Sequence, residues 1–150
     1  MPGRRAFLAG TAGLACALVL RPAAATPESM LAAIRALTGG VAPRTGRVRI
    51  EVPPLSENGN VVPLTVAVDS PMTPAEHVRA IHVFSEKNPD PRVLSVHLGP
   101  RSGRALLSTR IRLADTQTVI AVAELSDGSF WEQSASVVVT LAACLEELPS

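Results

Sequence analysis

Aromatic residues are scarce in this 150-residue chain, since they make up 3% of it with no tyrosine and one tryptophan. An aromatic ligand cage or a platform for stacking nucleic-acid bases needs several such rings, so the composition argues against both. An excess of positive charge is also missing, because 14 basic residues are balanced by 13 acidic ones. This balance excludes a nucleic-acid binder of the basic-patch type and argues against a polybasic membrane-surface protein.

Residues that bind metals are few as well. The chain has two cysteines, Cys16 and Cys144, and three histidines, His77, His82 and His97. A structural zinc site needs four ligands at close, paired spacing, and these residues do not provide it. We therefore expect no metal and no cofactor. We interpret His82 and His97 as polar strand residues that face solvent.

Catalytic motifs are missing from the sequence. A hydrolase needs a nucleophile, a base and an orienting acid, but no local signature surrounds Ser108, Ser126 or Ser134. The pair Gly39-Gly40 follows the wrong kind of element for a phosphate-binding loop. The sequence therefore predicts a protein that is not an enzyme and has no active site of its own.

The first 25 residues predict an export signal. Arg4-Arg5 precede the uncharged apolar or small run 6–20, and Ala23-Ala24-Ala25 fits a small-x-small cleavage site. The paired arginines resemble a twin-arginine signal, so we expect residues 1–25 to be a signal peptide of this type, cleaved after Ala25. A mature chain from residue 26 would have 11 basic and 13 acidic residues, or a net charge of −2.

Two other interpretations of this leader are less favoured. A membrane anchor needs about 20 apolar residues to span a bilayer, and this run has about 15. A lipoprotein site at Cys16 is disfavoured because Gly13 stands where such a site prefers leucine. We therefore expect a periplasmic protein with no stable membrane insertion after cleavage, and with Cys144 as its single thiol.

The start of the mature chain predicts one short amphipathic helix. Residues 26–40 begin with a threonine cap and a proline suited to the first turn, and they end at two glycines. Apolar residues recur on one helical face at Met30, Ile34 and Leu37, with Leu31 alongside. We expect this face to pack on the domain or on a partner chain.

From residue 46 the hydrophobic pattern has a period of two, which predicts strands. The expected strands are separated by turn residues and cover 46–52, 62–68, 80–86, 93–98, 104–113, 119–125 and 130–141. About seven short strands with turns every 8–12 residues predict an all-β antiparallel sandwich over residues 26–141, including the N-terminal helix. The run Val137-Val138-Val139 is continuously apolar, so we expect the last strand to be covered on both faces.

Several segments, in order along the mature chain, resemble the SoxY family. They are Val62-Pro63-Leu64-Thr65-Val66, Asp69-Ser70-Pro71-Met72, Ile81-His82-Val83-Phe84, Glu86-Lys87-Asn88-Pro89, Ser108 to Leu113, Ser126 to Trp131 and Val137 to Thr140. SoxY is the sulfur-carrier subunit of the periplasmic thiosulfate-oxidising Sox system. The resemblance implies an immunoglobulin-like sandwich, a twin-arginine leader and a heterodimer with a SoxZ-like subunit.

The family's working part is a C-terminal arm that ends in Gly-Gly-Cys-Gly-Gly, and the resemblance places Cys144 at its sulfur-carrying cysteine. Residues 142–150, the expected carrier arm, depart from this pattern and look like a paralogous branch with Ala-Ala-Cys-Leu-Glu. Alanine removes backbone freedom that glycine allows. Glu146 and Glu147 disfavour a nearby thiolate and repel anions, so we expect low reactivity unless a partner supplies positive charge.

Two functions stay open at this point. In the first, Cys144 covalently carries a sulfur species, such as thiosulfate, between periplasmic sulfur-oxidising enzymes. In the second, the chain is a non-catalytic binding module or scaffold that pairs with a SoxZ-like subunit, and Cys144 is incidental. We favour the carrier, because the single mature thiol stands at the position where the family loads sulfur.

Overall fold

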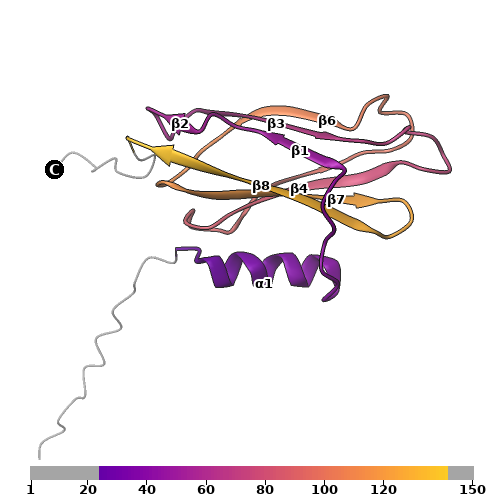
Figure 1. Cartoon of the computed structure of the whole chain (residues 1–150), viewed down its shortest axis with the longest axis horizontal. Coiled ribbons are helices and arrows are strands. Elements are labelled where there is room, and N and C mark those ends of the chain that lie inside the picture. The colour runs from indigo at the N-terminus through magenta and orange to yellow at the C-terminus, as the bar shows by residue number, and fades with distance from the viewer. Residues whose placement is uncertain (1–23, 142–150) are drawn as a thin grey trace, which may run out of the picture.

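The strands of this protein form two stacked sheets, one of three strands and one of five, and a helix lies against the outer face of the five-stranded sheet (Figure 1). The computed structural model describes residues 24–141. Their elements are α1 (Pro27–Thr38), β1 (Val48–Glu51), β2 (Leu55–Ser56), β3 (Val62–Val68), β4 (Val78–Ser85), β5 (Arg92–His97), β6 (Leu106–Ile111), β7 (Gln117–Leu125) and β8 (Phe130–Val139). No helix within residues 24–141 has the length and hydropathy needed to cross a membrane.

The two layers are sheets with the strand orders β1-β3-β6 and β2-β8-β7-β4-β5. Neighbouring strands are antiparallel except β2 and β8, which run parallel through Leu55 and Val138. The prediction of an all-β sandwich with a short N-terminal helix is confirmed. Strand β2 was not predicted, because two residues are too few to show a period-two pattern.

The core fills the space between the two sheets. Strand β3 shows the expected alternation, since Val62, Leu64, Val66 and Val68 are buried and the residues between them are more exposed. Strands of the opposite sheet contribute buried aliphatic side chains to the same cluster, namely Ile81, Val83, Val119, Ala121 and Val137. Burial of these apolar side chains is the main force that holds the layers together.

Helix α1 begins and ends where the sequence predicts. The hydroxyl of Thr26 accepts a hydrogen bond from the Ser29 N–H at 3.1 Å, and the Ser29 hydroxyl accepts one from the Thr26 N–H at 2.7 Å. This reciprocal cap satisfies N–H groups that a helix start leaves without partners. Gly39 ends the helix with a φ of 66°, a left-handed conformation that glycine adopts without steric cost.

The apolar face of α1 packs on the outer face of the five-stranded sheet. Met30 and Ile34 are each 3% exposed, and they form one cluster with Phe84, Ile120 and Val122. Figure 1 shows the helix lying along this layer. Because α1 covers one face and the core covers the other, most residues of β4 and β7 are buried.

The prediction that the last strand is covered on both faces is wrong. Val137 and Val139 are buried in the core, whereas Val138 is 48% exposed. The helix packs on β4, β7 and the start of β8, at Phe130. The outer face of β8 near its end therefore has no cover among the described residues.

Candidate functional site

The described chain stops at Leu141, three residues before Cys144. The predicted carrier residue and the whole predicted arm, 142–150, therefore lie outside the described residues. Three residues of extended chain span at most about 10–11 Å, which bounds the distance between the Cα atoms of Leu141 and Cys144. The candidate site is therefore the end of the sandwich at which residue 141 lies, together with the side chains that surround it.

Backbone hydrogen bonds hold the last described residues to this end of the sandwich. The Thr140 N–H donates to the Ser56 carbonyl at 3.1 Å, and the Gly59 N–H donates to the Leu141 carbonyl at 2.9 Å. The Leu113 N–H then donates to the Gly59 carbonyl at 2.8 Å. Gly59 thus connects Leu141 to Leu113, just after β6, and these bonds fix the position of the backbone at Leu141. The start of α1 lies at the same end (Figure 1).

Asn88 links three separate segments at this end. Its side-chain Nδ2 donates to the Arg112 carbonyl at 2.8 Å, and its Oδ1 accepts from the Ala114 N–H and from Gln117 Nε2, both at 3.0 Å. Its backbone carbonyl accepts from the Ala25 N–H at 2.8 Å. One side chain therefore joins the β4–β5 loop to the β6–β7 turn, while its backbone holds the residue before the helix cap.

Gln117 completes this network from a buried position, with 4% of its surface exposed. Its Oε1 accepts from the Lys87 N–H at 2.9 Å, and its Nε2 also donates to the Asp115 carbonyl at 3.0 Å. Buried amides need such partners, because an unsatisfied polar group costs stability. No local pattern in the sequence predicts this role of Asn88 and Gln117, although the segment Glu86-Lys87-Asn88-Pro89 is one of those that resemble the SoxY family.

The interpretation of His82 as a solvent-facing residue is wrong, because His82 is 8% exposed. Its Nδ1 lies 2.7 Å from the Ser95 hydroxyl, whereas its Nε2 is buried without a hydrogen-bond partner, 4.0 Å from Glu124 Oε2. Burial lowers the pKa of His82 from its ordinary value of 6.5, the Glu124 carboxylate opposes this shift, and His97 adds to it. His82 is therefore neutral near pH 7, and the neutral ring has a lower free-energy cost of burial than the charged one.

The other histidines do not form a reactive cluster with His82. His97 is exposed, and its ring meets that of His82 edge-on with the centroids 6.2 Å apart. His77 Nδ1 lies 3.1 Å from the Thr73 carbonyl. Among residues 24–141, no three or more His, Cys, Asp or Glu side chains are grouped in a way that could hold a metal ion.

The three serines considered as nucleophiles have no histidine ring as a partner in the described part of the chain. The Ser126 hydroxyl accepts from the backbone N–H of His77 at 3.0 Å, which is a structural bond. The Ser108 hydroxyl lies 3.4 Å from that of Thr65. A base within hydrogen-bond distance is the first requirement for an activated serine, and none of the three meets it here.

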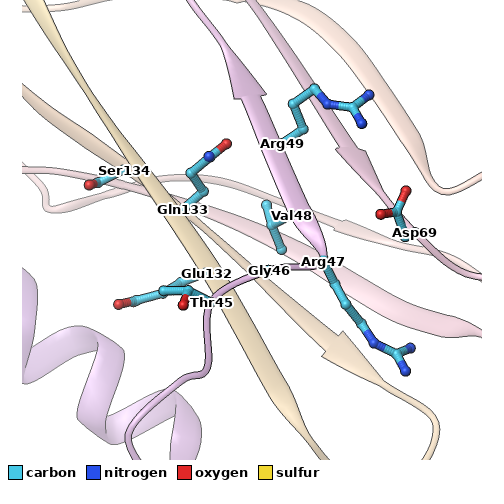
Figure 2. Close-up of a pocket in the computed structure, with 9 residues that line it drawn as sticks. All are labelled: Thr45, Gly46, Arg47, Val48, Arg49, Asp69, Glu132, Gln133 and Ser134. Atoms are coloured by element: carbon cyan, nitrogen blue, oxygen red, sulfur yellow. The ribbon is translucent and has the colours of Figure 1, made fainter.

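A hollow of about 390 Å³ lies between the start of β1 and the middle of β8. Figure 2 shows that its polar side chains do not converge, since Arg47 and Arg49 point away from Glu132. Arg47 is paired with Glu76 at 2.9 Å. Burial raises the pKa of Glu132. Because the charged groups diverge or are already paired, this hollow does not assemble a catalytic or anion-binding centre.

The sequence matches a known protein family over most of its length. Residues 34–144 match the family described as sulfur oxidation protein SoxY. The chain belongs to the SoxY family. The match covers the end of α1, the whole sandwich and the position of Cys144, so the chain is a SoxY-like sulfur-oxidation protein with partners in the Sox system. None of the curated proteins matches the chain in sequence.

Solved structures with a similar fold include superoxide reductases. The superoxide reductase (neelaredoxin) of Ignicoccus hospitalis is 17% identical with a TM-score of 0.56, and the alignment covers 77% of this chain and 94% of that one. The superoxide reductase of Nanoarchaeum equitans is 12% identical with a TM-score of 0.52, and the alignment covers 64% of this chain and all of that one. At these identities the likeness shows a shared fold alone.

Proposed function

We propose that this SoxY-family chain is a periplasmic sulfur carrier that holds a sulfur species covalently on Cys144. The observation that carries the proposal is the family match, which runs from residue 34 to residue 144 and so ends on that cysteine. Cys144 is also the only cysteine after residue 25. A chain with one thiol beyond its sandwich domain has a single position at which sulfur can be attached and from which it can be removed.

The chemistry of loading requires the thiolate of Cys144, because the thiolate is the nucleophilic form. With thiosulfate, a new S–S bond forms between Sγ and the outer sulfur of the anion, and the thiol proton goes to solvent. The same step releases two electrons, which a partner oxidoreductase has to accept. The electrons are therefore expected to leave through the partner enzymes, which supply the redox chemistry that the carrier itself does not perform.

The expected location and partner belong to the same proposal. A twin-arginine leader over residues 1–25 would deliver the folded chain to the periplasm, and a SoxZ-like subunit would pair with it there. Within the described residues the strands at the sheet edges are β1, β2, β5 and β6, since each of them has one neighbour in its sheet. Open edges present unpaired backbone groups, which favours association with another chain.

The test is the mass of the intact mature chain, residues 26–150, mixed with its SoxZ-like subunit, thiosulfate and the partner oxidoreductases. We expect one sulfur adduct on the wild type and none on Cys144→Ser, a variant that replaces one atom and leaves no thiol in the mature chain. A Cys144→Ser strain should lose the sulfur oxidation that depends on this chain. Full activity of that strain, with no adduct on the wild type, would instead leave the scaffold function.

A further inference from the structure

One side of the sandwich has an uneven distribution of charge. Residues 91–114 contain five arginines, Arg92, Arg101, Arg104, Arg110 and Arg112, and no acidic residue. This segment includes β5, the loop after it, and β6. Strand β5 is an edge of the five-stranded sheet and β6 is an edge of the three-stranded sheet, so both lie on an open side.

Three of these arginines line one cavity at the Asn88 end of the sandwich. Arg92, Arg110 and Arg112 are exposed and line a cavity of about 450 Å³ beside Asn88. None of the three forms an ion pair or a side-chain hydrogen bond with another residue in the range 24–141. Asp90 is the one acidic residue of the lining, and its carboxylate accepts from the Arg92 N–H at 2.8 Å.

These arginines differ from two other arginines of the sandwich, Arg47 and Arg79. Arg47 is paired with Glu76, and Arg79 lies 3.8 Å from Glu124, so neighbouring carboxylates offset both charges. At the cavity, three guanidinium groups face one carboxylate, which leaves an excess of two positive charges. Guanidinium groups present planar pairs of N–H donors that match the oxygens of sulfonate and phosphate groups.

The cavity also lies within reach of the C-terminal segment. Arg112 precedes Leu113, and two successive hydrogen bonds connect Leu113 to Gly59 and Gly59 to Leu141. Residues joined by a backbone hydrogen bond have Cα atoms about 5.5 Å apart, so the two bonds in series keep Leu141 within about 11 Å of Leu113. Three further residues reach at most about 10–11 Å from Leu141, so Cys144 can approach the arginines without any change in the sandwich.

We infer that Arg92, Arg110 and Arg112 form a binding site for the oxyanion end of the sulfur group that Cys144 carries. The inference rests on the proposed carrier function and adds the recognition chemistry that the cysteine lacks. The site offsets the negative charges of Glu146 and Glu147, which otherwise repel anions such as thiosulfate. From the sequence alone we expected a partner to supply this positive charge, whereas here three arginines of the same chain supply it.

The experiment compares two methanethiosulfonate reagents of opposite charge on the full mature chain. In both, the Cys144 thiolate attacks the outer sulfur, a disulfide forms and methanesulfinate leaves, so the reagents differ only in the transferred group. One reagent carries a sulfonate and the other a trimethylammonium group. Removal of two positive charges at about 10 Å in water should slow the anionic reagent about fourfold and speed the cationic one about fourfold, so the anion-to-cation rate ratio should fall about 10- to 20-fold at low ionic strength. High salt should remove this difference.

The test variant is Arg110→Gln with Arg112→Gln, and the matched control is Arg101→Gln with Arg104→Gln. Both pairs remove two charges from the same segment, but the control pair lies in the loop after β5, at the opposite end of the strands. We expect the rate ratio to fall in the test variant alone. An equal fall of the rate ratio in both variants would show a general effect of positive charge on Cys144, and no fall in either would show no such effect. Either result would overturn the proposed site.

Two further measurements separate this inference from competing outcomes. If the arginines only bind Glu146 and Glu147, then replacement of Arg110 and Arg112 should not change the rate ratio in a Glu146→Gln, Glu147→Gln background. That result would overturn the oxyanion site. Loading with thiosulfate and the partner enzymes tests the carrier function itself. If the Arg110→Gln, Arg112→Gln variant loads as fast as the wild type, the site fails while the carrier function stands. If the wild type never loads, the carrier function fails.

Discussion

Replacement of Asn88 by alanine should destabilise the end of the sandwich that bears the C-terminal segment. The Asn88 side chain makes three hydrogen bonds, to the Arg112 carbonyl, the Ala114 N–H and the Gln117 amide, over 2.8–3.0 Å. A typical hydrogen bond contributes about 1 kcal/mol net, so loss of all three should lower the free energy of unfolding by about 3 kcal/mol. For a domain of this size that corresponds to a fall in Tm of about 10 °C.

The assay is urea unfolding of a chain that spans residues 26–150, followed by the fluorescence of its single tryptophan, Trp131. Asn58→Ala is the matched control, because the Asn58 side chain accepts one local bond in an exposed turn, from the Asn60 N–H at 2.9 Å. We expect the control to lose less than about 1 kcal/mol. A free energy of unfolding for Asn88→Ala within about 0.5 kcal/mol of the control would refute the network as a stabilising element.

The remaining predictions concern the helix and the buried histidine. Ile34→Ala should cost about 2–4 kcal/mol in urea unfolding, because Ile34 is 3% exposed, whereas Leu31→Ala, at a position 48% exposed, should cost under about 1 kcal/mol. The free energy of unfolding should also fall as pH falls below the ordinary histidine value of 6.5, since burial lowers the pKa of His82 and the unfolded chain takes up the proton first. His82→Gln should remove part of this slope and His97→Gln should not, so equal slopes in the two variants would contradict the assignment.

Local patterns in the sequence were enough to predict the elements that build the sandwich. The alternation of Val62, Leu64, Val66 and Val68 predicted β3, and its burial follows that pattern. The threonine cap and the closing glycines predicted α1 with its observed apolar face. These features depend on residues within one or two turns of one another, so the period of the pattern determines both the element and the face that becomes buried.

Local patterns misled where burial depends on a distant element. His82 has the polar character of a solvent-facing strand residue, but α1 packs on the same outer sheet face, at Phe84 and Val122, and His82 is buried there. Val138 has the apolar character of a core residue, but no described element covers it. In each case the exposed fraction of the side chain depends on which distant segment packs over the strand. The residues of the strand do not predict that segment.

The sequence by itself determined that Cys144 is the one cysteine after residue 25, the family to which the chain belongs and the two-layer β architecture. Only the tertiary structure decided that Arg92, Arg110 and Arg112 line one cavity near the root of the C-terminal segment, with Asn88 joining the loops around them. The reason is the connection between β5 and β6, which passes from one sheet to the other. This crossover brings residues about 20 positions apart to the same end of the sandwich, a placement that arises from strand pairing and loop closure and not from any local pattern.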